Sequence, residues 1–194
     1  MKYAFLLVVL AAIALGCGKS KTVTRIAPET QTDLSGRWND TDARLVAKEM
    51  TTDALDRPWL TDWMVGKSAK PIVTVGGIKN NTSEHIDTDA FTIDFERELL
   101  NSGKVRFVAR KTQRDEVRDE RQDQAEWASK ETMKQIRNET GADFVLLGSI
   151  QSITDQEDKN STIFYQTNFE LINIETNEKV WIGQKEIKKG ISMN

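Results

Sequence analysis

Few residues of this chain have the type and spacing that catalysis or metal binding requires. His85 is the sole histidine, and Glu84 and Asp87 beside it do not complete a metal site, which takes three or four ligands. No serine stands in the Gly-x-Ser-x-Gly motif of a hydrolase nucleophile, and Gly76-Gly77 lacks the pattern of a phosphate-binding loop. The sequence therefore predicts a protein that is not an enzyme, with no catalytic residue, metal or cofactor.

Cys17 is the exception, because it is the only cysteine and its position suits covalent modification. It follows an apolar run, Ala4–Leu15, behind Lys2. That pattern is typical of a secretory signal and is shorter than the roughly twenty residues that a membrane-spanning helix needs. A lone cysteine in an exported chain forms no internal disulfide. The string Ala-Leu-Gly-Cys at 14–17 resembles the lipobox of bacterial lipoproteins, which implies that the thiol is diacylated and becomes the acylated mature N-terminus.

The same motif bears on location. Several acyl chains on one residue give stable membrane anchoring, where one chain binds reversibly. Residue 18 is glycine, whereas in the enterobacterial lipoproteins that the motif resembles, aspartate there retains the protein at the inner membrane. By that analogy we expect a lipid anchor in the outer membrane, with the protein facing the periplasm. An ordinary cleavage site with a chance cysteine nearby is the alternative.

Composition indicates one folded domain. The 194 residues include 27 Lys and Arg and 30 Asp and Glu, a net charge of -3, and the basic residues are dispersed. Such a distribution gives no reason to expect a nucleic-acid partner. The expected organisation is a lipoprotein signal peptide over 1–16, the lipidated cysteine and a polar, Thr-rich tether over 17–37, and a globular periplasmic domain over 38–194.

Residues that suit helix caps predict where three helices begin. Asn39 suits the N-cap of a helix that runs to about Leu55. Pro58 suits the first turn of a second, short helix, where its missing N–H costs nothing. Asp87 suits the cap of a third, which ends at about Gly103 and carries two apolar rows, so we expect contacts on two of its sides. The inward residues are expected to be Leu45, Val46 and Met50 in the first helix, and Phe91, Phe95 and Leu99 with Ala90, Ile93 and Leu100 in the third.

Charged residues at helical spacing over 111–124 are typical of a solvated helix face. Apolar residues return at Trp127, Met133 and Ile136, which predicts one or two helices before Gly141.

Strand patterns alternate with the helices and then follow one another directly. Residues 71–78 predict a strand in which the glycine pair indicates a bulge, and 105–108 a short one. Residues 142–153 are too continuously apolar for a half-exposed strand, so we expect them inside the sheet. Two further strands, 163–174 and 179–188, complete an antiparallel meander. The expected fold is a single α/β (α+β) domain with a mixed sheet that ends in this meander and helices packed on it.

One stretch resembles a known family. Residues 70–88, KPIVTVGGIKNNTSEHIDT, are similar to the core of the LpoB family of lipoprotein activators of penicillin-binding proteins. Segments 120–124, 139–144 and 165–171 agree in the family's order, so the resemblance covers about 34–189. It implies a fold similar to the N-terminal domain of TolB. It also implies a non-enzymatic regulator of peptidoglycan synthesis that docks on a bifunctional class A penicillin-binding protein and activates it.

Candidate docking residues come from two polar regions, since loops on a rigid scaffold often carry function. The first is a loop that the core is not expected to require, and the second is the charged stretch. The candidates are Asn80, Asn81, Glu84 and His85 in the first and Arg121 and Gln122 in the second. A contact with peptidoglycan itself is left open. The tether spans at most about 70 Å when extended, less than the Pro- and Gln-rich tether of the best-known family member, so the identity of the synthase is also left open.

Other classes of function make different demands. A glycan-binding module would need exposed tryptophans along a groove, and Trp59 and Trp63 are the best-placed pair. A secretion-pore relative would need amphipathic membrane hairpins, and the meander at 162–188 carries too many charges for that. A hydrolase would need an acid and a base that converge in a cleft.

Overall fold

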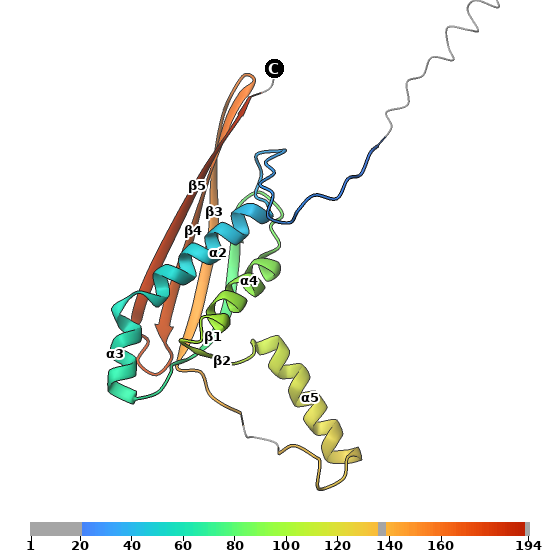
Figure 1. Ribbon diagram of the computed structural model, residues 1–194, viewed down its shortest axis with the longest axis vertical. Coiled ribbons are helices and arrows are strands. Elements are labelled where there is room, and N and C mark those ends of the chain that lie inside the picture. The colour runs from blue at the N-terminus through green and yellow to red at the C-terminus, as the bar shows by residue number, and fades with distance from the viewer. Residues whose placement is uncertain (1–20, 136–138, 193–194) are drawn as a thin grey trace, which may run out of the picture. The chain divides into compact units, whose positions relative to one another are not determined.

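The computed structural model describes residues 21–135 and 139–192 of the chain. Contacts divide the chain after Thr30, and residues 21–30 contain no helix or strand. Gln31–Asn194 forms one unit, in which helices pack on a five-stranded sheet of order β2-β1-β3-β4-β5 (Figure 1). The elements are α2 (Asp40–Leu55), α3 (Pro58–Lys67), β1 (Ile72–Asn81), α4 (Thr88–Asn101), β2 (Arg106–Phe107), α5 (Lys111–Trp127), β3 (Phe144–Glu157), β4 (Asn160–Asn173) and β5 (Lys179–Ser192). Within the described ranges no helix has the length and apolar character needed to cross a bilayer.

The sheet is mixed, as predicted. Strand β1 pairs in parallel with β2 and with β3, and parallel neighbours require long crossovers such as the helical connections seen here. Strands β3, β4 and β5 pair antiparallel through short turns and form the predicted meander. The expectation that β3 lies inside the sheet is confirmed, because β1 and β4 flank it.

The glycine pair forms the predicted bulge in β1. The register shifts between Val75 and Ile78, so the strand gains a residue against β3. A Cβ atom on Gly76 would lie 2.4 Å from Leu147 Cδ2, which explains the need for glycine at this position. Beyond the bulge the strand continues to Asn81, further than the predicted residue 78. The loop is therefore shorter than expected, and Asn80 and Asn81 are strand residues.

The core lies between the sheet and α2, α3 and α4. In β4 every second residue is buried, the alternation of a strand with one covered face. The ring of Phe169 stacks on Phe95, with centroids 4.9 Å apart, and lies edge-on to Phe91 at 5.8 Å. Since β3 is built in the same way, its apolar run is not buried throughout: Leu146 faces the helices and Leu147 is exposed on the other face.

Helix caps follow the sequence closely. Asn39 caps α2, and its side chain accepts from the N–H of Asp42 while the Asp42 carboxylate accepts from the Asn39 N–H. This capping box fixes where the helix starts. The Asp87 carboxylate likewise accepts from the N–H groups of Asp89 and Ala90 at the start of α4.

Predictions about helix faces were less accurate. Leu45 of α2 is exposed, whereas Val46 and Met50 are buried as expected. Only the first apolar row of α4 is buried, while Ile93 and Leu100 of the second are exposed, so the expectation of contacts on two sides was wrong. The physical reason is that α2 and α4 form a single layer on the sheet, and the outer side of that layer faces solvent.

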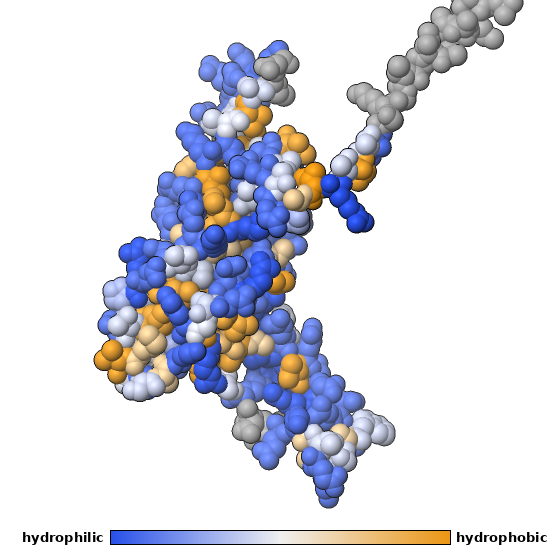
Figure 2. Space-filling model, in the orientation of Figure 1, coloured by the Kyte–Doolittle hydropathy of each residue, from blue (hydrophilic) through white to orange (hydrophobic). Residues whose placement is uncertain are grey.

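Helix α5 matches the solvated helix predicted from its charges, since none of its residues is buried. The surface over it is predominantly hydrophilic (Figure 2). The described residues before Gly141 contain one helix, α5, which agrees with the predicted one or two. Residues 129–135 form no second helix, and the apolar side chains that return there lie outside the core, because Trp127 is 76% exposed and Met133 is also exposed. Ile136 lies outside the described residues.

Candidate functional site

The first group of candidate residues lies at the end of β1 and in the loop between β1 and α4, and the Asn80 side chain holds this loop together. The Asn80 side-chain oxygen accepts from the N–H of Thr82 at 3.0 Å, and its amide nitrogen donates to the carbonyl oxygen of Glu84 at 2.8 Å. These bonds close a compact polar turn at the end of the strand. The exposed side chains of Asn81 and His85 flank it.

Glu84 has a role inside the domain. Its Oε2 accepts from the backbone N–H of Trp38 at 3.1 Å, and its Oε1 accepts from the hydroxyl of Tyr165 at 2.5 Å. Tyr165 is fully buried on β4. The expectation that the core does not require this loop therefore fails for Glu84, which joins the loop to the start of the domain and to the sheet. Its docking role stays a prediction.

The environment of Tyr165 raises the pKa of its phenol above the ordinary value, first because of burial and then because the hydroxyl donates to the Glu84 carboxylate. A raised folded-state pKa means that above pH 10 the unfolded chain releases this proton while the folded chain retains it. Stability should therefore fall as the pH rises past 10.

A titration can isolate this group, because the chain has only two tyrosines and Tyr3 lies in the predicted signal peptide. In protein purified without residues 1–16, tyrosinate absorbance should appear only as the domain unfolds, and in urea it should appear near pH 10. The Glu84→Gln variant should titrate at lower pH than the wild type, because the adjacent negative charge is gone. Appearance of tyrosinate near pH 10 in the folded protein would contradict the assignment.

The second group of candidates lies on α5, where Arg121 binds another part of the chain. Arg118 donates two bonds of 2.9 Å to the Glu139 carboxylate, and Arg121 Nη1 donates to the same carboxylate at 3.0 Å. The hydrogen bonds from Arg118, together with the positive charges, lower the pKa of Glu139. Arg121 thus joins α5 to the segment before β3. Of the two candidates on α5, Arg121 and Gln122, only Gln122 is exposed. None of these contacts brings Arg121 or Gln122 to the candidate residues at the β1–α4 loop.

A third cluster, centred on Lys189 of β5, was missed by the sequence analysis. Lys189 Nζ donates to Asp42 Oδ2 at 2.6 Å, to Asp33 Oδ1 at 2.7 Å and to the carbonyl oxygen of Arg37 at 3.1 Å. Burial opposes the charge of Lys189, but the hydrogen bonds to both carboxylates outweigh it and raise the pKa. The bond from Lys189, together with hydrogen bonds from the Gln31 and Asn39 side chains, lowers the pKa of Asp33 to about 2. The one signal available in the sequence was Asp42 in the first turn of the helix after Asn39.

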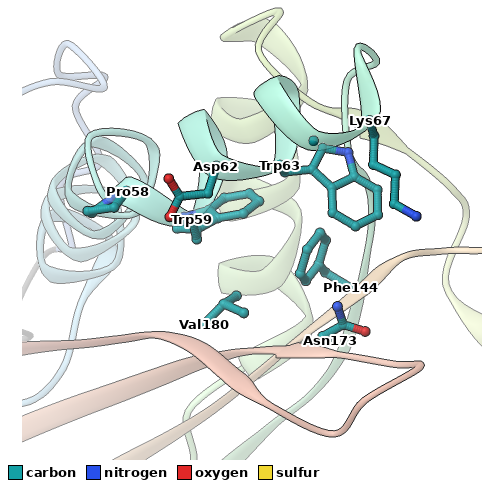
Figure 3. Close-up of a pocket in the computed structure, with 9 residues that line it drawn as sticks. Pro58, Trp59, Asp62, Trp63, Lys67, Phe144, Asn173 and Val180 are labelled. Carbon is teal, nitrogen blue, oxygen red and sulfur yellow. The ribbon is translucent and has the colours of Figure 1, made fainter.

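The predicted tryptophan pair belongs largely to the core. Trp59 and Trp63 of α3 both lie edge-on to Phe144, with ring centroids 5.2 and 5.0 Å away, and the Trp59 indole donates to the carbonyl oxygen of Ala54. Both border a hollow of about 530 Å³ between α3 and the sheet, where Lys67 lies over the Trp63 ring (Figure 3). Trp59 is buried, which removes it as a stacking platform for a sugar. Among the described residues no group of three or more His, Cys, Asp or Glu side chains is placed to hold a metal ion.

Comparison with known proteins gives one family match. The family described as "Peptidoglycan-synthase activator LpoB" matches residues 42–187, which extend from the first turn of α2 into β5. No curated protein matches the chain significantly.

Three solved structures are similar to this chain at low identity. The LpoB C-terminal domain from Escherichia coli is 19% identical, with a TM-score of 0.44, over 75% of this chain and 98% of that one. The NMR structure of E. coli LpoB is 16% identical, with a TM-score of 0.42, over 93% and 88%. Lipoprotein GNA1162 from Neisseria meningitidis is 15% identical, with a TM-score of 0.40, over 62% and 83%.

Proposed function

This chain belongs to the LpoB family of peptidoglycan-synthase activators, and from that premise we propose that it docks on a bifunctional class A penicillin-binding protein and activates it. The observation that carries the proposal is the family match over 42–187, which takes in nearly all of the folded unit. Its role is regulatory, since activation requires only that the domain bind the active conformation of the synthase more tightly than the resting one.

The proposed place of action is the periplasmic side of the outer membrane. Cys17 would be lipidated and would hold the domain there, with the chain that follows as its tether. This part of the proposal is supported by the lipobox-like string at 14–17 and by glycine at position 18.

For the docking surface, the most suitable candidates are residues with exposed side chains that are free of the domain's own network. Asn81 and His85 meet this condition at the β1–α4 loop, and Gln122 meets it on α5. Asn80 and Glu84 support the loop from within, and Arg121 is bound to Glu139, so their substitution would also disturb the domain.

The test is a reconstituted polymerisation assay. The purified chain without residues 1–17 should bind its cognate class A synthase and raise the rate of glycan polymerisation, because coupling depends on differential affinity and not on the lipid. A chain that binds none of the class A synthases of its own cell and changes no polymerisation rate would overturn the proposal.

The same assay tests the docking residues. His85→Ala and Asn81→Ala should each weaken synthase binding by about tenfold, as expected of interface side chains that contribute ~1 kcal/mol or more, with little change in the melting temperature. Lys159→Ala is a suitable control, because Lys159 is exposed in the turn between β3 and β4. Binding unchanged in both variants would place docking elsewhere, and equal loss of binding and stability would make these residues structural.

A further inference from the structure

The segment Gln31–Arg37 lies within the predicted tether, yet it is bound to the domain. It contacts Lys189 through the Asp33 carboxylate and the carbonyl oxygen of Arg37. The ammonium of lysine has three donors, and here Asp42 accepts the third bond. The side chains of Lys189 and Asp42 are only 10% and 7% exposed. The segment therefore supplies partners for a largely buried charge, and losing them would leave Lys189 incompletely bonded.

A second attachment involves the peptide group that joins Arg37 to Trp38. Its carbonyl oxygen accepts from Lys189, and its N–H donates to Glu84, so both polar atoms of one peptide group are bound. The partners come from β5 and from the β1–α4 loop. The chain is thus fixed at Trp38 from two directions.

A third attachment depends on Gly36. This residue has φ +69°, a conformation that glycine adopts readily and other residues rarely do. A Cβ atom there would lie 2.4 Å from Ile191 Cδ1. The segment therefore lies directly against β5, and a side chain at this position would push it away.

From these contacts we infer that Gln31–Arg37 is a strap, a part of the predicted tether that Lys189 and Ile191 hold against the domain, next to the bond from Trp38 to Glu84. We infer that release of the strap sets how far the domain reaches from its anchor. With the strap closed, the chain between the proposed anchor and the strap covers residues 17–30 and spans at most about 48 Å when fully extended. With the strap open, it runs to Arg37 and spans at most about 70 Å. The consequence for reach rests on the proposed function and its lipid anchor, whereas the closed strap is a property of the domain alone.

Limited trypsin digestion tests the strap itself. Cleavage after Arg37 requires that both sides of the Arg37–Trp38 peptide leave their partners, so it should be slow in the full chain purified in detergent, and slower than cleavage after Arg25. Asp33→Asn should speed cleavage after Arg37 about fivefold or more, because cleavage follows the population of the open form and the Asp33 charge favours the closed form. The Lys189–Asp42 pair is kept in this variant, so the domain stays folded.

Two glycine substitutions give an independent comparison. Gly36→Ala should open the strap by steric pressure and should act equally at low and high salt, unlike Asp33→Asn. Gly190→Ala is the matched control, since the added Cβ would meet no atom within 4 Å beyond Gly190 and its two chain neighbours. The inference is overturned if wild type is cleaved as fast after Arg37 as after Arg25, or if neither Asp33→Asn nor Gly36→Ala differs from the control.

A tether of altered length tests the consequence in the cell. Deletion of residues 22–27 should reduce synthase activation in vivo, and Asp33→Asn in the same chain should restore it, because the released strap replaces the lost length. If digestion shows that the strap is open in this variant but activation is not restored, the strap does not set how far the domain reaches. If the reconstituted assay shows no activation, the proposed function is wrong. The digestion experiment still tests, independently, whether the strap is bound to the domain.

Discussion

Replacing Phe169 with alanine is expected to lower the free energy of unfolding by about 3–5 kcal/mol. Phe169 of β4 is 0% exposed on the covered face of the sheet, where it contacts the rings of Phe91 and Phe95. On the neighbouring strand, a Cβ atom at Gly148 would lie 2.6 Å from the Phe169 ring. The chain thus leaves a space for this side chain, and alanine would leave a cavity there. Urea unfolding followed by tryptophan fluorescence measures the loss.

Phe164→Ala is the matched control, because Phe164 lies on the same strand but points to the other face and is only partly buried. Phe164→Ala should lower the free energy of unfolding by only about 1 kcal/mol, because the Phe164 side chain removes less apolar area from water. Equal losses in the two variants would contradict the arrangement of one covered and one open face.

Replacing Cys17 with alanine is expected to abolish both lipid attachment and activity in the cell, since the acyl chains are the proposed anchor. The purified domain should stay folded with an unchanged melting temperature, because the elements that build its core begin at Asp40. Membrane fractionation and labelling with a radioactive or clickable fatty acid measure the effect. Cys17 itself lies outside the described residues.

Gly18→Ala is a suitable control for this variant, because it changes the neighbouring residue without removing the thiol. It should be acylated and fractionate as the wild type does. A Cys17→Ala chain that takes up label and sediments with the membrane as before would refute lipidation at this position.

Local features were predictable because their causes lie within a few residues. Asn39 and Asp87 start helices through bonds to backbone groups two or three positions away. The bulge at Gly76-Gly77 and the β3–β5 meander likewise reflect glycine geometry and alternation along single strands. The exposure of Ile93 and Leu147 was not predictable in this way, because an apolar pattern does not show whether a second layer will cover it.

For the candidate site too, the sequence identified the residues and the structure showed which of them are exposed. The sequence identified the polar residues around the β1–α4 loop, and exposure then separated Asn81 and His85 from Glu84, which bonds to Tyr165 from 81 positions away. Arg121 was noted for its charge, but its bond to Glu139 depends on how the chain returns after α5.

By itself, the sequence determined the family, the lipobox-like motif at Cys17 and the order of helices and strands, since each is carried by contiguous residues. Only the tertiary structure decided which face of the sheet is covered and that the chain from Gln31 onward is bound to the folded unit. Lys189 and Asp33 are 156 positions apart, and neither residue type indicates a partner at that distance. β5 packs beside α2, and this places the largely buried Lys189 ammonium next to the chain that precedes the helix. Because a buried charge is costly without hydrogen-bond partners, the acceptors in that chain stabilise it.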